Sequence, residues 1–262
     1  MTVNFEKYHG NGNDFIIIDD RSENFDAGKN IIKRMCDRHF GIGADGLMLV
    51  RKSEVADFSM LYYNSDGALS TMCGNGGRCV AAFAYSKGIA DKEMLFDAVD
   101  GFHKAEVNIV KNSEDLYNVS LQMIDVEEIK KGDFYYFLDT GSPHHVLFTD
   151  DVEEINVYEE GKKIRYGKQY SPDGTNVNFV KIDDDGIFVR TYERGVENET
   201  LSCGTGVTAS AIATYLKTGK KPGKIKTLGG IFEVSFIYDD EKFTDIRLIG
   251  PAEKVFSGKI KL

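Results

Sequence analysis

Short hydrophobic runs separated by Gly, Asp and Asn turns dominate the pattern of the chain. Runs rich in β-branched and aromatic residues are typical of strands, and they occupy 15–19, 46–50, 58–64, 144–149, 176–182, 186–193 and 231–238. Helical spacing is rarer and appears at 31–40, in the Ala-rich runs after Cys73 and Cys203, and in part of 151–164. This balance predicts an α+β fold built on mostly antiparallel sheet.

The second half of the chain repeats a module of the first. When Cys73 is aligned with Cys203, the shared residues are Gly74 with Gly204, Gly76 with Gly206, Ala81 with Ala211, Tyr85 with Tyr215 and Lys87 with Lys217. A strand ending at Tyr63-Asn64 likewise matches one ending at Tyr192-Glu193. Two copies of one strand-turn-helix module predict two similar domains that face each other. The acidic segment at 111–133 is a candidate hinge between them.

Composition narrows the class of protein. The 262 residues are 42% hydrophobic, which is ample for a packed core, and the formal net charge of −10 disfavours nucleic acid as a partner. The N-terminus lacks a signal-peptide pattern and the apolar runs are too short to cross a membrane, so we expect a cytoplasmic protein with reduced thiols. The cysteine and histidine spacings do not fit a zinc site. The expected partner is a small molecule.

Cys73 and Cys203 each precede a glycine-rich turn and a predicted helix. A helix N-terminus stabilises anions, and a thiol placed there ionises more readily than usual. A lone cysteine is more often a small buried hydrophobe, but the repeated arrangement favours function for this pair. Cys36 and Cys79 lack the same setting, and we expect them in the core.

Two thiols that face each other suit a racemase or epimerase. One, as thiolate, removes a proton from one face of a carbon, while the other, as thiol, returns a proton to the opposite face. The two helix N-termini would hold the substrate carboxylate and stabilise the negative charge that develops beside it.

Other polar residues fit a cleft that binds an amino acid. Asn13 and Asp14 are expected in a turn before a strand, His144 follows a proline, Asn176 begins a strand, and Glu193 and Arg194 end one. Each also has a purely structural explanation, such as a turn or a surface ion pair. Proximity to the cysteine modules favours a substrate-binding role most for Asn64, Glu193 and Arg194.

These segments together resemble the pyridoxal-independent diaminopimelate epimerases. The matching motifs are HGNGNDF, GIGADGL, YNSDG, CGNGGRC, SPHH, GTNVNFV, ERGVENET and CGTG, and they span nearly the whole chain. The resemblance implies two pseudosymmetric domains, each with sheet wrapped around a central helix, at 1–120 and 121–250, with a final strand at 251–262 returning to the first. It also implies conversion of LL-diaminopimelate to the meso form, a step towards lysine and peptidoglycan, without a cofactor or metal.

The resemblance assigns roles to particular residues. Cys73 and Cys203 would be the acid/base pair, and His144 and Glu193 would tune the thiols. The implied substrate contacts are Asn13, Asn64, Gly74, Asn75, Asn176, Glu193, Arg194, Gly204 and Thr205. Arg194 would hold a second, distal carboxylate. We also expect a homodimer.

Two residues depart from the family pattern, and two alternative functions stay open. Gly46 stands where many members carry Gln, and Ser142 stands where they carry Asn. We interpret both as variation at the far end of the substrate, with a water or backbone group replacing the first side chain. The alternatives are a racemase of proline, hydroxyproline or histidine, which would not need Arg194, and a thiol redox protein or noncatalytic amino-acid-binding module. Hydrogen exchange at the substrate α-carbon separates enzyme from binder.

Overall fold

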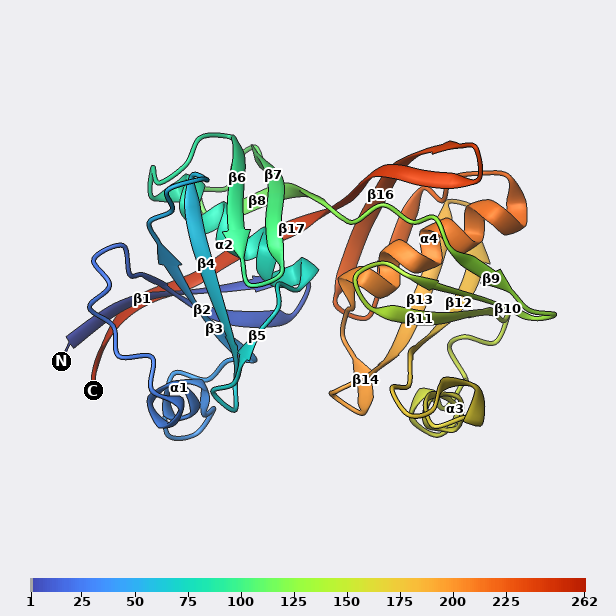
Figure 1. Cartoon of the computed structure of the whole chain (residues 1–262), viewed down its shortest axis with the longest axis horizontal. Helices are drawn as coiled ribbons and strands as arrows, with labels where there is room; N and C mark the ends of the chain where they lie inside the picture. Colours follow the sequence, from blue (N-terminus) through green and yellow to red (C-terminus); the bar gives the residue numbers. More distant parts are fainter. Residues whose placement is uncertain (1) are drawn as a thin grey trace. The chain divides into compact units, whose positions relative to one another are not determined.

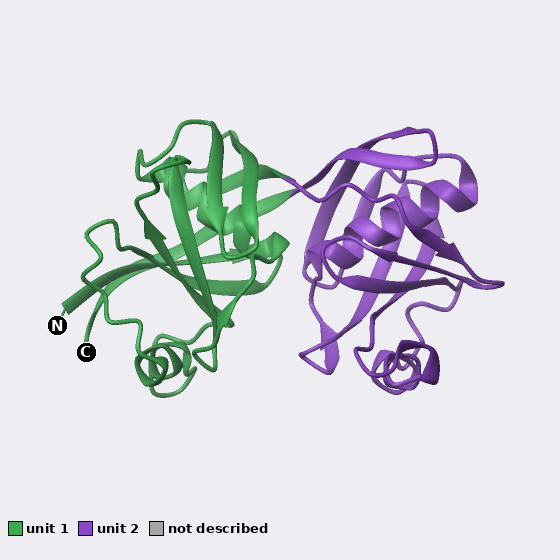
Figure 2. Ribbon diagram, viewed as in Figure 1, with its two compact units in different colours: residues 1–121, 250–262 green, residues 122–249 purple. Residues whose placement is uncertain are grey.

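The structure is a computed structural model that describes residues 2–262, and the chain forms two compact units. Unit 1 comprises residues 1–121 and 250–262, and unit 2 comprises residues 122–249 (Figure 2).

Unit 1 is a ring of strands that surrounds one helix (Figure 1). Its strands are β1 (Thr2–Gly10), β2 (Asn13–Asp19), β3 (Gly46–Arg51), β4 (Phe58–Asn64), β5 (Leu69–Ser70), β6 (Glu93–Ala98), β7 (Gly101–Ile109), β8 (Leu116–Gln122) and the last part of β17 (Lys242–Lys261). In the order β1, β2, β3, β4, β6, β7, β8, β17, each strand pairs with the next, and β17 closes the ring by pairing with β1. Helix α2 (Gly74–Ser86) is buried over most of its length, and α1 (Lys29–Cys36) is shorter.

Unit 2 repeats this arrangement around α4 (Gly204–Thr218). Its strands are β9 (Ile129–Lys131), β10 (Tyr135–Asp139), β11 (Pro143–Phe148), β12 (Asn176–Asp183), β13 (Gly186–Glu193), β14 (Asn198–Thr200), β15 (Lys224–Thr227), β16 (Gly230–Asp239) and the first part of β17. The helix α3 (Val157–Arg165) and the short 3-10 helix η1 (Lys168–Tyr170) lie between β11 and β12 in the sequence.

The pairing patterns of the two units match strand by strand. The parallel pair β2 and β3 corresponds to the parallel pair β11 and β12, and β4 with β6 corresponds to β13 with β15. Each central helix follows the short strand that pairs with β4 or β13. The predicted α+β fold with two pseudosymmetric halves is therefore confirmed.

Two segments differ from the sequence-based expectation. The helix predicted at 31–40 runs instead from Lys29 to Cys36, because Asp37 adopts an extended backbone and its carboxylate accepts the N–H groups of His39 and Phe40. The candidate hinge at 111–133 contains β8, which pairs with both β7 and β17. The chain thus passes from unit 1 to unit 2 directly after a paired strand.

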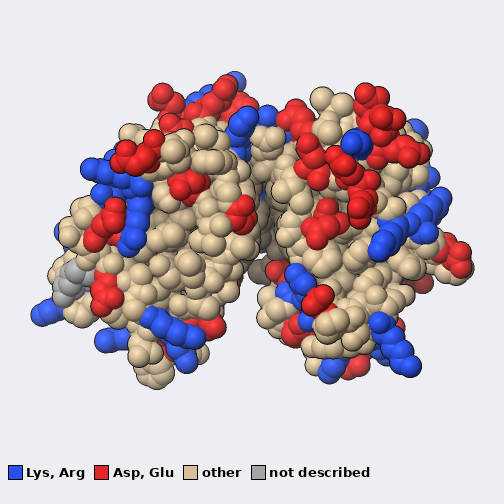
Figure 3. All heavy atoms as spheres, in the orientation of Figure 1, with Lys and Arg blue, Asp and Glu red and all other residues tan. Residues whose placement is uncertain are grey.

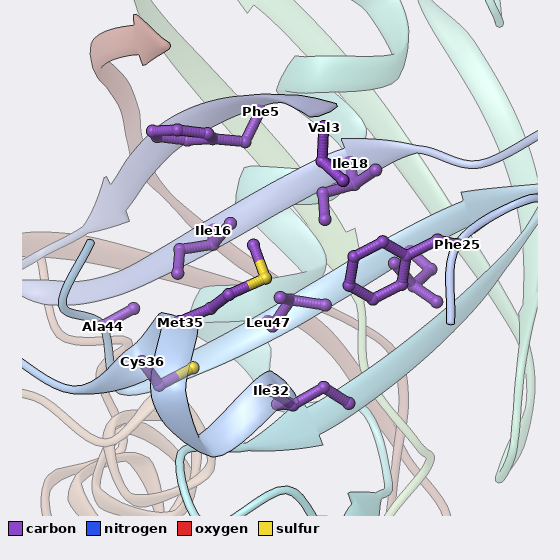
Figure 4. Close-up of a cluster of buried hydrophobic side chains, with 11 residues drawn as sticks. Val3, Phe5, Ile16, Ile18, Phe25, Ile32, Met35, Cys36, Ala44 and Leu47 are labelled. Atoms are coloured by element: carbon purple, nitrogen blue, oxygen red, sulfur yellow. The ribbon is translucent and has the colours of Figure 1, made fainter. Parts of the chain in front are cut away.

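The two remaining cysteines lie in the core, as expected. Cys36 and Met35 pack from α1 against Ile16 and Leu47 of the sheet (Figure 4). Burial raises the pKa of Cys36 to about 12 and also raises the pKa of Cys79, a fully buried residue of α2. Both thiols therefore stay protonated at neutral pH.

Lys and Arg side chains are dispersed among Asp and Glu side chains on the face of the molecule in Figure 3. Among residues 2–262, none of the helices is both long enough and apolar enough to cross a membrane.

Candidate active site

Cys73 and Cys203 occupy the same position in the two units, the N-cap of the central helix. Cys73 has an extended backbone (φ −108°, ψ 151°), and its Sγ accepts the Gly76 N–H at 3.2 Å. Cys203 is similarly extended (φ −125°, ψ 111°) and is 8% exposed. The first N–H groups of a helix have no acceptor inside it and carry partial positive charge. Each thiol therefore sits where a thiolate is stabilised.

The third residue of each central helix is a glycine, because the first turn of the helix lies very close to side chains of the sheet. A Cβ at Gly76 would lie 2.6 Å from Met48 Cε and 3.2 Å from Cys73 Sγ. A Cβ at Gly206 would collide with Asn178 Oδ1 and lie 3.3 Å from His144 Cε1. The second glycine of the shared C-G-x-G pattern thus follows from the close approach of helix and strand.

A fully buried arginine lies in the first turns of α2, beneath Cys73. Arg78 donates to Gly74 O at 3.0 Å, to Asn75 Oδ1 at 2.9 Å and to Asn11 Oδ1 at 3.1 Å. Burial lowers the pKa of Arg78 to about 10, so the guanidinium keeps its charge at neutral pH. A cation in this place favours the thiolate form of Cys73 and fixes Asn75.

Asn13 is the first residue of β2 and not part of a turn, which corrects the sequence-based expectation. The turn is made by Asn11 and Gly12, both with positive φ, as two-residue hairpins require. Asn13 Nδ2 donates to Asp45 Oδ2 at 2.6 Å, and Asn13 Oδ1 lies 3.4 Å from Asn75 Nδ2. These contacts bring Asn13 to the N-terminus of α2.

Asp14 is part of a charge cluster that supports Asn13. Its carboxylate bonds to Arg38 at 2.7 and 3.0 Å and pairs with Lys7 at 2.7 Å, while Arg38 also reaches Asp45 at 2.8 Å. Burial acts to raise the pKa of Asp14, but hydrogen bonds from Arg38 and Lys7 outweigh it, and the pKa is lowered overall. The sequence places Asp14 near the site; the structure gives it a scaffold role.

Cys203 faces a polar network from β11 and β12. Its Sγ lies 3.4 Å from Thr205 Oγ1, which lies 2.8 Å from His144 Nε2, and His144 Nδ1 lies 3.0 Å from Asn178 Nδ2. Burial, and then the charge of Arg194, lower the pKa of His144 to about 3. His144 is therefore neutral at neutral pH, and it is connected to the Cys203 thiol by way of the Thr205 hydroxyl.

Glu193 and Arg194 follow one another at the end of β13. Asn176 Oδ1 accepts the Arg194 N–H at 2.8 Å, and Asn176 Nδ2 donates to Ser142 Oγ at 2.8 Å. Glu193 Oε2 accepts the hydroxyl of Thr200 at 2.8 Å. Asn176 thus holds the backbone that carries Arg194. Because Ser142 Oγ accepts a hydrogen bond from Asn176, the hydroxyl hydrogen of Ser142 remains available for donation to another group.

Asn64 ends β4 directly opposite Gly46 of β3. The space beside Gly46 is taken by Tyr62, because a Cβ at Gly46 would collide with the Tyr62 ring and lie 2.7 Å from Tyr63 O. That a water or backbone group takes over the role of a side chain at this position stays a prediction. The ring of Tyr62, which packs edge-on against Phe15 at 5.9 Å, occupies the space.

Sequence reasoning missed Arg78 and Asn178. Arg78 stands in the quoted CGNGGRC motif, and an arginine within an otherwise apolar helix was a usable signal. Asn178 lies two residues after Asn176 and so on the same face of the same strand. Among residues 2–262, no three His, Cys, Asp or Glu side chains form a group that could hold a metal ion.

Solved structures of low sequence identity share the whole fold. A PhzF-family phenazine biosynthesis protein from Bacillus anthracis superposes with a TM-score of 0.77 at 16% identity and covers 100% of both chains. A hydroxyproline epimerase from Agrobacterium vitis gives a TM-score of 0.70 at 15% identity, covering 99% of this chain and 91% of that one. The fold is thus of the class found in this amino-acid epimerase and in the PhzF-family protein.

Sequence relatives define the family within that class. The family model for diaminopimelate epimerase matches residues 5–123 and 136–255. A diaminopimelate epimerase of Flavobacterium psychrophilum is 51% identical, covering 97% of this chain and 98% of the relative, and one of Aquifex aeolicus is 40% identical, covering 98% of both. The chain belongs to the diaminopimelate epimerase family.

Proposed function

We propose that this protein is an isomerase that converts LL-diaminopimelate to meso-diaminopimelate with Cys73 and Cys203 as its acid/base pair and without pyridoxal phosphate. The observation that carries the proposal is the repeated placement of a thiol at the N-cap of a central helix, in a chain of this family. The product would feed lysine and peptidoglycan synthesis in the cytoplasm, and we expect the active protein to be a homodimer.

The reaction moves one proton off a carbon and another onto it. The thiolate of one cysteine takes the α-proton, and the electron pair left on the carbon delocalises into the adjacent carboxylate. The N–H groups at the starts of α2 and α4 stabilise this added negative charge. The thiol of the other cysteine then donates its proton to the opposite face, so that the configuration inverts and no redox change occurs.

The polar residues around each thiol would bind the substrate. Asn13, Asn64 and Asn75 in unit 1, with Asn176 and Thr205 in unit 2, supply amides and a hydroxyl, and the backbones of Gly74 and Gly204 supply N–H groups. We assign Arg194 to the distal carboxylate and Glu193 to the distal ammonium group. A guanidinium is suited to this task because it binds a carboxylate with two parallel hydrogen bonds.

The proposal is tested by incubating the pure protein with LL-diaminopimelate, without pyridoxal phosphate, in heavy water. We expect the meso isomer to form with deuterium at the inverted carbon. Cys73→Ala and Cys203→Ala should each lower kcat by at least about 1000-fold, by analogy with removal of other acid/base groups.

Cys79→Ala is the matched control, because Cys79 lies further along the same helix and is fully buried. It should keep most of the activity. Near-normal turnover by either Cys73→Ala or Cys203→Ala would sink the two-thiol assignment. Binding of diaminopimelate without any deuterium incorporation would instead identify a noncatalytic binding protein.

A further inference from the structure

The amide of Asn178 has one orientation that satisfies all of its neighbours. Its Nδ2 lies 3.3 Å from the His145 carbonyl oxygen, which can only accept a hydrogen bond. Its Oδ1 lies 2.9 Å from the Thr191 hydroxyl, which donates to it. The second hydrogen of Nδ2 is then directed at His144 Nδ1, 3.0 Å away.

This orientation decides which nitrogen of His144 carries the proton. Because Nδ1 accepts from an amide, it must be the unprotonated nitrogen, and a neutral imidazole then carries its hydrogen on Nε2. His144 is fully buried, which disfavours the imidazolium form. His144 Nε2–H therefore donates to Thr205 Oγ1 across 2.8 Å.

A hydroxyl that accepts one hydrogen bond remains able to donate its own hydrogen. Thr205 Oγ1 lies 3.4 Å from Cys203 Sγ, within the range of hydrogen bonds to sulfur. With His144 donating to it, Thr205 cannot give its hydrogen back to Nε2 and can give it to the sulfur. A thiolate accepts this bond far better than a thiol does.

The equivalent positions of unit 1 carry no such network. Phe15 Cζ and Met48 Cε lie beneath Gly76 just as His144 Cε1 and Asn178 Oδ1 lie beneath Gly206. Phe15 pairs with Gly46 as His144 pairs with Asn176 in the register of the parallel strands. Cys73 therefore serves as an internal reference for the effect of this network on the Cys203 thiol.

We propose that Asn178 is a positioning residue that holds His144 as the neutral Nε2–H tautomer and thereby directs the Thr205 hydroxyl hydrogen at the Cys203 thiolate. The consequence is a thiolate at Cys203 that is favoured without any positive charge from His144. The proposal deepens the proposed function, since it concerns one of the two cysteines named there.

The first experiment reads the tautomer in the unaltered protein. Nitrogen-15 NMR of histidine-labelled protein, with the His144 signals assigned from a His144→Gln variant, should show a bare Nδ1 and a protonated Nε2 between about pH 6 and 8. A protonated Nδ1, or an imidazolium at pH 7, would overturn the proposal. The experiment requires neither substrate nor a variant that must retain full stability.

The second experiment measures thiol ionisation residue by residue. The pH dependence of alkylation of Cys203, followed by mass spectrometry, should shift upward by about one pH unit in Thr205→Val, which loses the hydroxyl, and stay near wild type in Thr205→Ser. Asn178→Met, which installs the residue found at the equivalent position of unit 1, should shift it in the same direction. An unchanged midpoint for Cys203 in Thr205→Val would refute the proposed hydrogen bond.

Cys73 provides the control within each sample, because its alkylation midpoint should stay the same in all three variants. Neither experiment depends on diaminopimelate. A protein with the predicted tautomer and Cys203 shift but no epimerase activity would refute the proposed function alone, and the converse result would refute the network alone.

Discussion

The N-termini of α2 and α4 have similar backbone conformations but differ in the side chains that pack against them. The fifth residue of each helix donates to the carbonyl oxygen of the first at 3.0 Å, but that residue is a buried arginine, Arg78, in α2 and a hydroxyl, Thr208, in α4. The sheet side chains below are Phe15 and Met48 in unit 1, against His144 and Asn178 in unit 2. The repeat therefore keeps an extended cysteine at the N-cap, while it supplies positive charge to one thiol and a neutral hydrogen-bond network to the other.

The thiolate forms of the two cysteines are therefore favoured by different interactions. A thiolate beside a buried cation is stabilised by charge, which acts over several ångströms and needs no precise alignment. A thiolate that accepts a hydroxyl hydrogen is stabilised only when the donor is correctly oriented. The two sites can thus be perturbed independently of each other.

The largest effect is expected at Arg194, which follows β13, whereas the equivalent residue after β4 in unit 1 is the uncharged Ser65. If Arg194 binds the distal carboxylate, Arg194→Met leaves that carboxylate unpaired at a cost of about 2–5 kcal/mol, by analogy with truncated buried charge pairs. This corresponds to a loss in kcat/KM of roughly 30- to 5000-fold on LL-diaminopimelate.

Steady-state kinetics of Arg194→Met and Arg194→Lys measure this loss, and Lys should rescue little because it cannot reproduce the bidentate fork. Arg247→Met is the matched control, since Arg247 pairs at 3.1 Å with Asp245 on β17. Full activity of Arg194→Met on diaminopimelate, or a wild-type preference for histidine or proline, would remove both the role of Arg194 and the substrate assignment.

A smaller effect is expected from removal of the cation beneath Cys73. Arg78→Met removes the hydrogen bonds that the guanidinium donates to Gly74, Asn75 and Asn11, so we expect a loss of about 3 kcal/mol in the free energy of unfolding. Denaturant titration measures this loss. The pH midpoint for alkylation of Cys73 should rise by about one unit while that of Cys203 stays constant.

Thr208→Val is the counterpart substitution in α4, and it should cost only about 1 kcal/mol because it removes a single neutral hydrogen bond. Arg78→Lys keeps the charge and should preserve the Cys73 midpoint better than Arg78→Met. If the alkylation midpoint of Cys73 were the same in Arg78→Met as in the wild type, the charge of Arg78 would not be what stabilises the Cys73 thiolate.

The sequence was sufficient to predict the fold class, the repeat and the helices that follow Cys73 and Cys203. These features depend on local patterns, namely hydrophobic runs, glycine turns and an Ala-rich helix after each cysteine. The end of α1 was misplaced because Asp37 competes for the backbone N–H groups with its own side chain. That competition is local, but the periodic pattern of 31–40 does not reveal it.

The side-chain partners could not be predicted in the same way. Asn176 is a predicted substrate contact, and the structure adds that both ends of its amide bond to Ser142, Pro143 and the backbone of Arg194. The ring of Tyr62 beside Gly46 depends on the register of β3 against β4, which the sequence of either strand alone does not specify. Burial of Arg78 likewise requires the closed ring of strands around α2.

A further effect concerns acid stability and follows from the two buried histidines of β11, whereas Phe15, the unit 1 counterpart of His144, cannot ionise. Burial lowers the pKa of His144 to about 3 and that of His145 to about 4, from 6.5. Below pH 6.5 the unfolded chain takes up protons that the folded protein does not, so stability is lost as the pH falls. The loss from His144 continues to about pH 3 and that from His145 to about pH 4.

Each histidine should therefore cost about 2 kcal/mol of unfolding free energy between pH 8 and pH 5, at about 1.4 kcal/mol per unit below pH 6.5. His144→Gln cannot take up the proton in either state, so its deficit relative to wild type should shrink by this amount over the same range. His145→Gln should behave alike to pH 5 but stop converging near pH 4, whereas His144→Gln converges further. Denaturant titrations at pH 8, 5 and 3.5 measure these differences, and curves for His144→Gln and wild type that run parallel from pH 8 to 5 would show that His144 takes up its proton normally inside the folded protein.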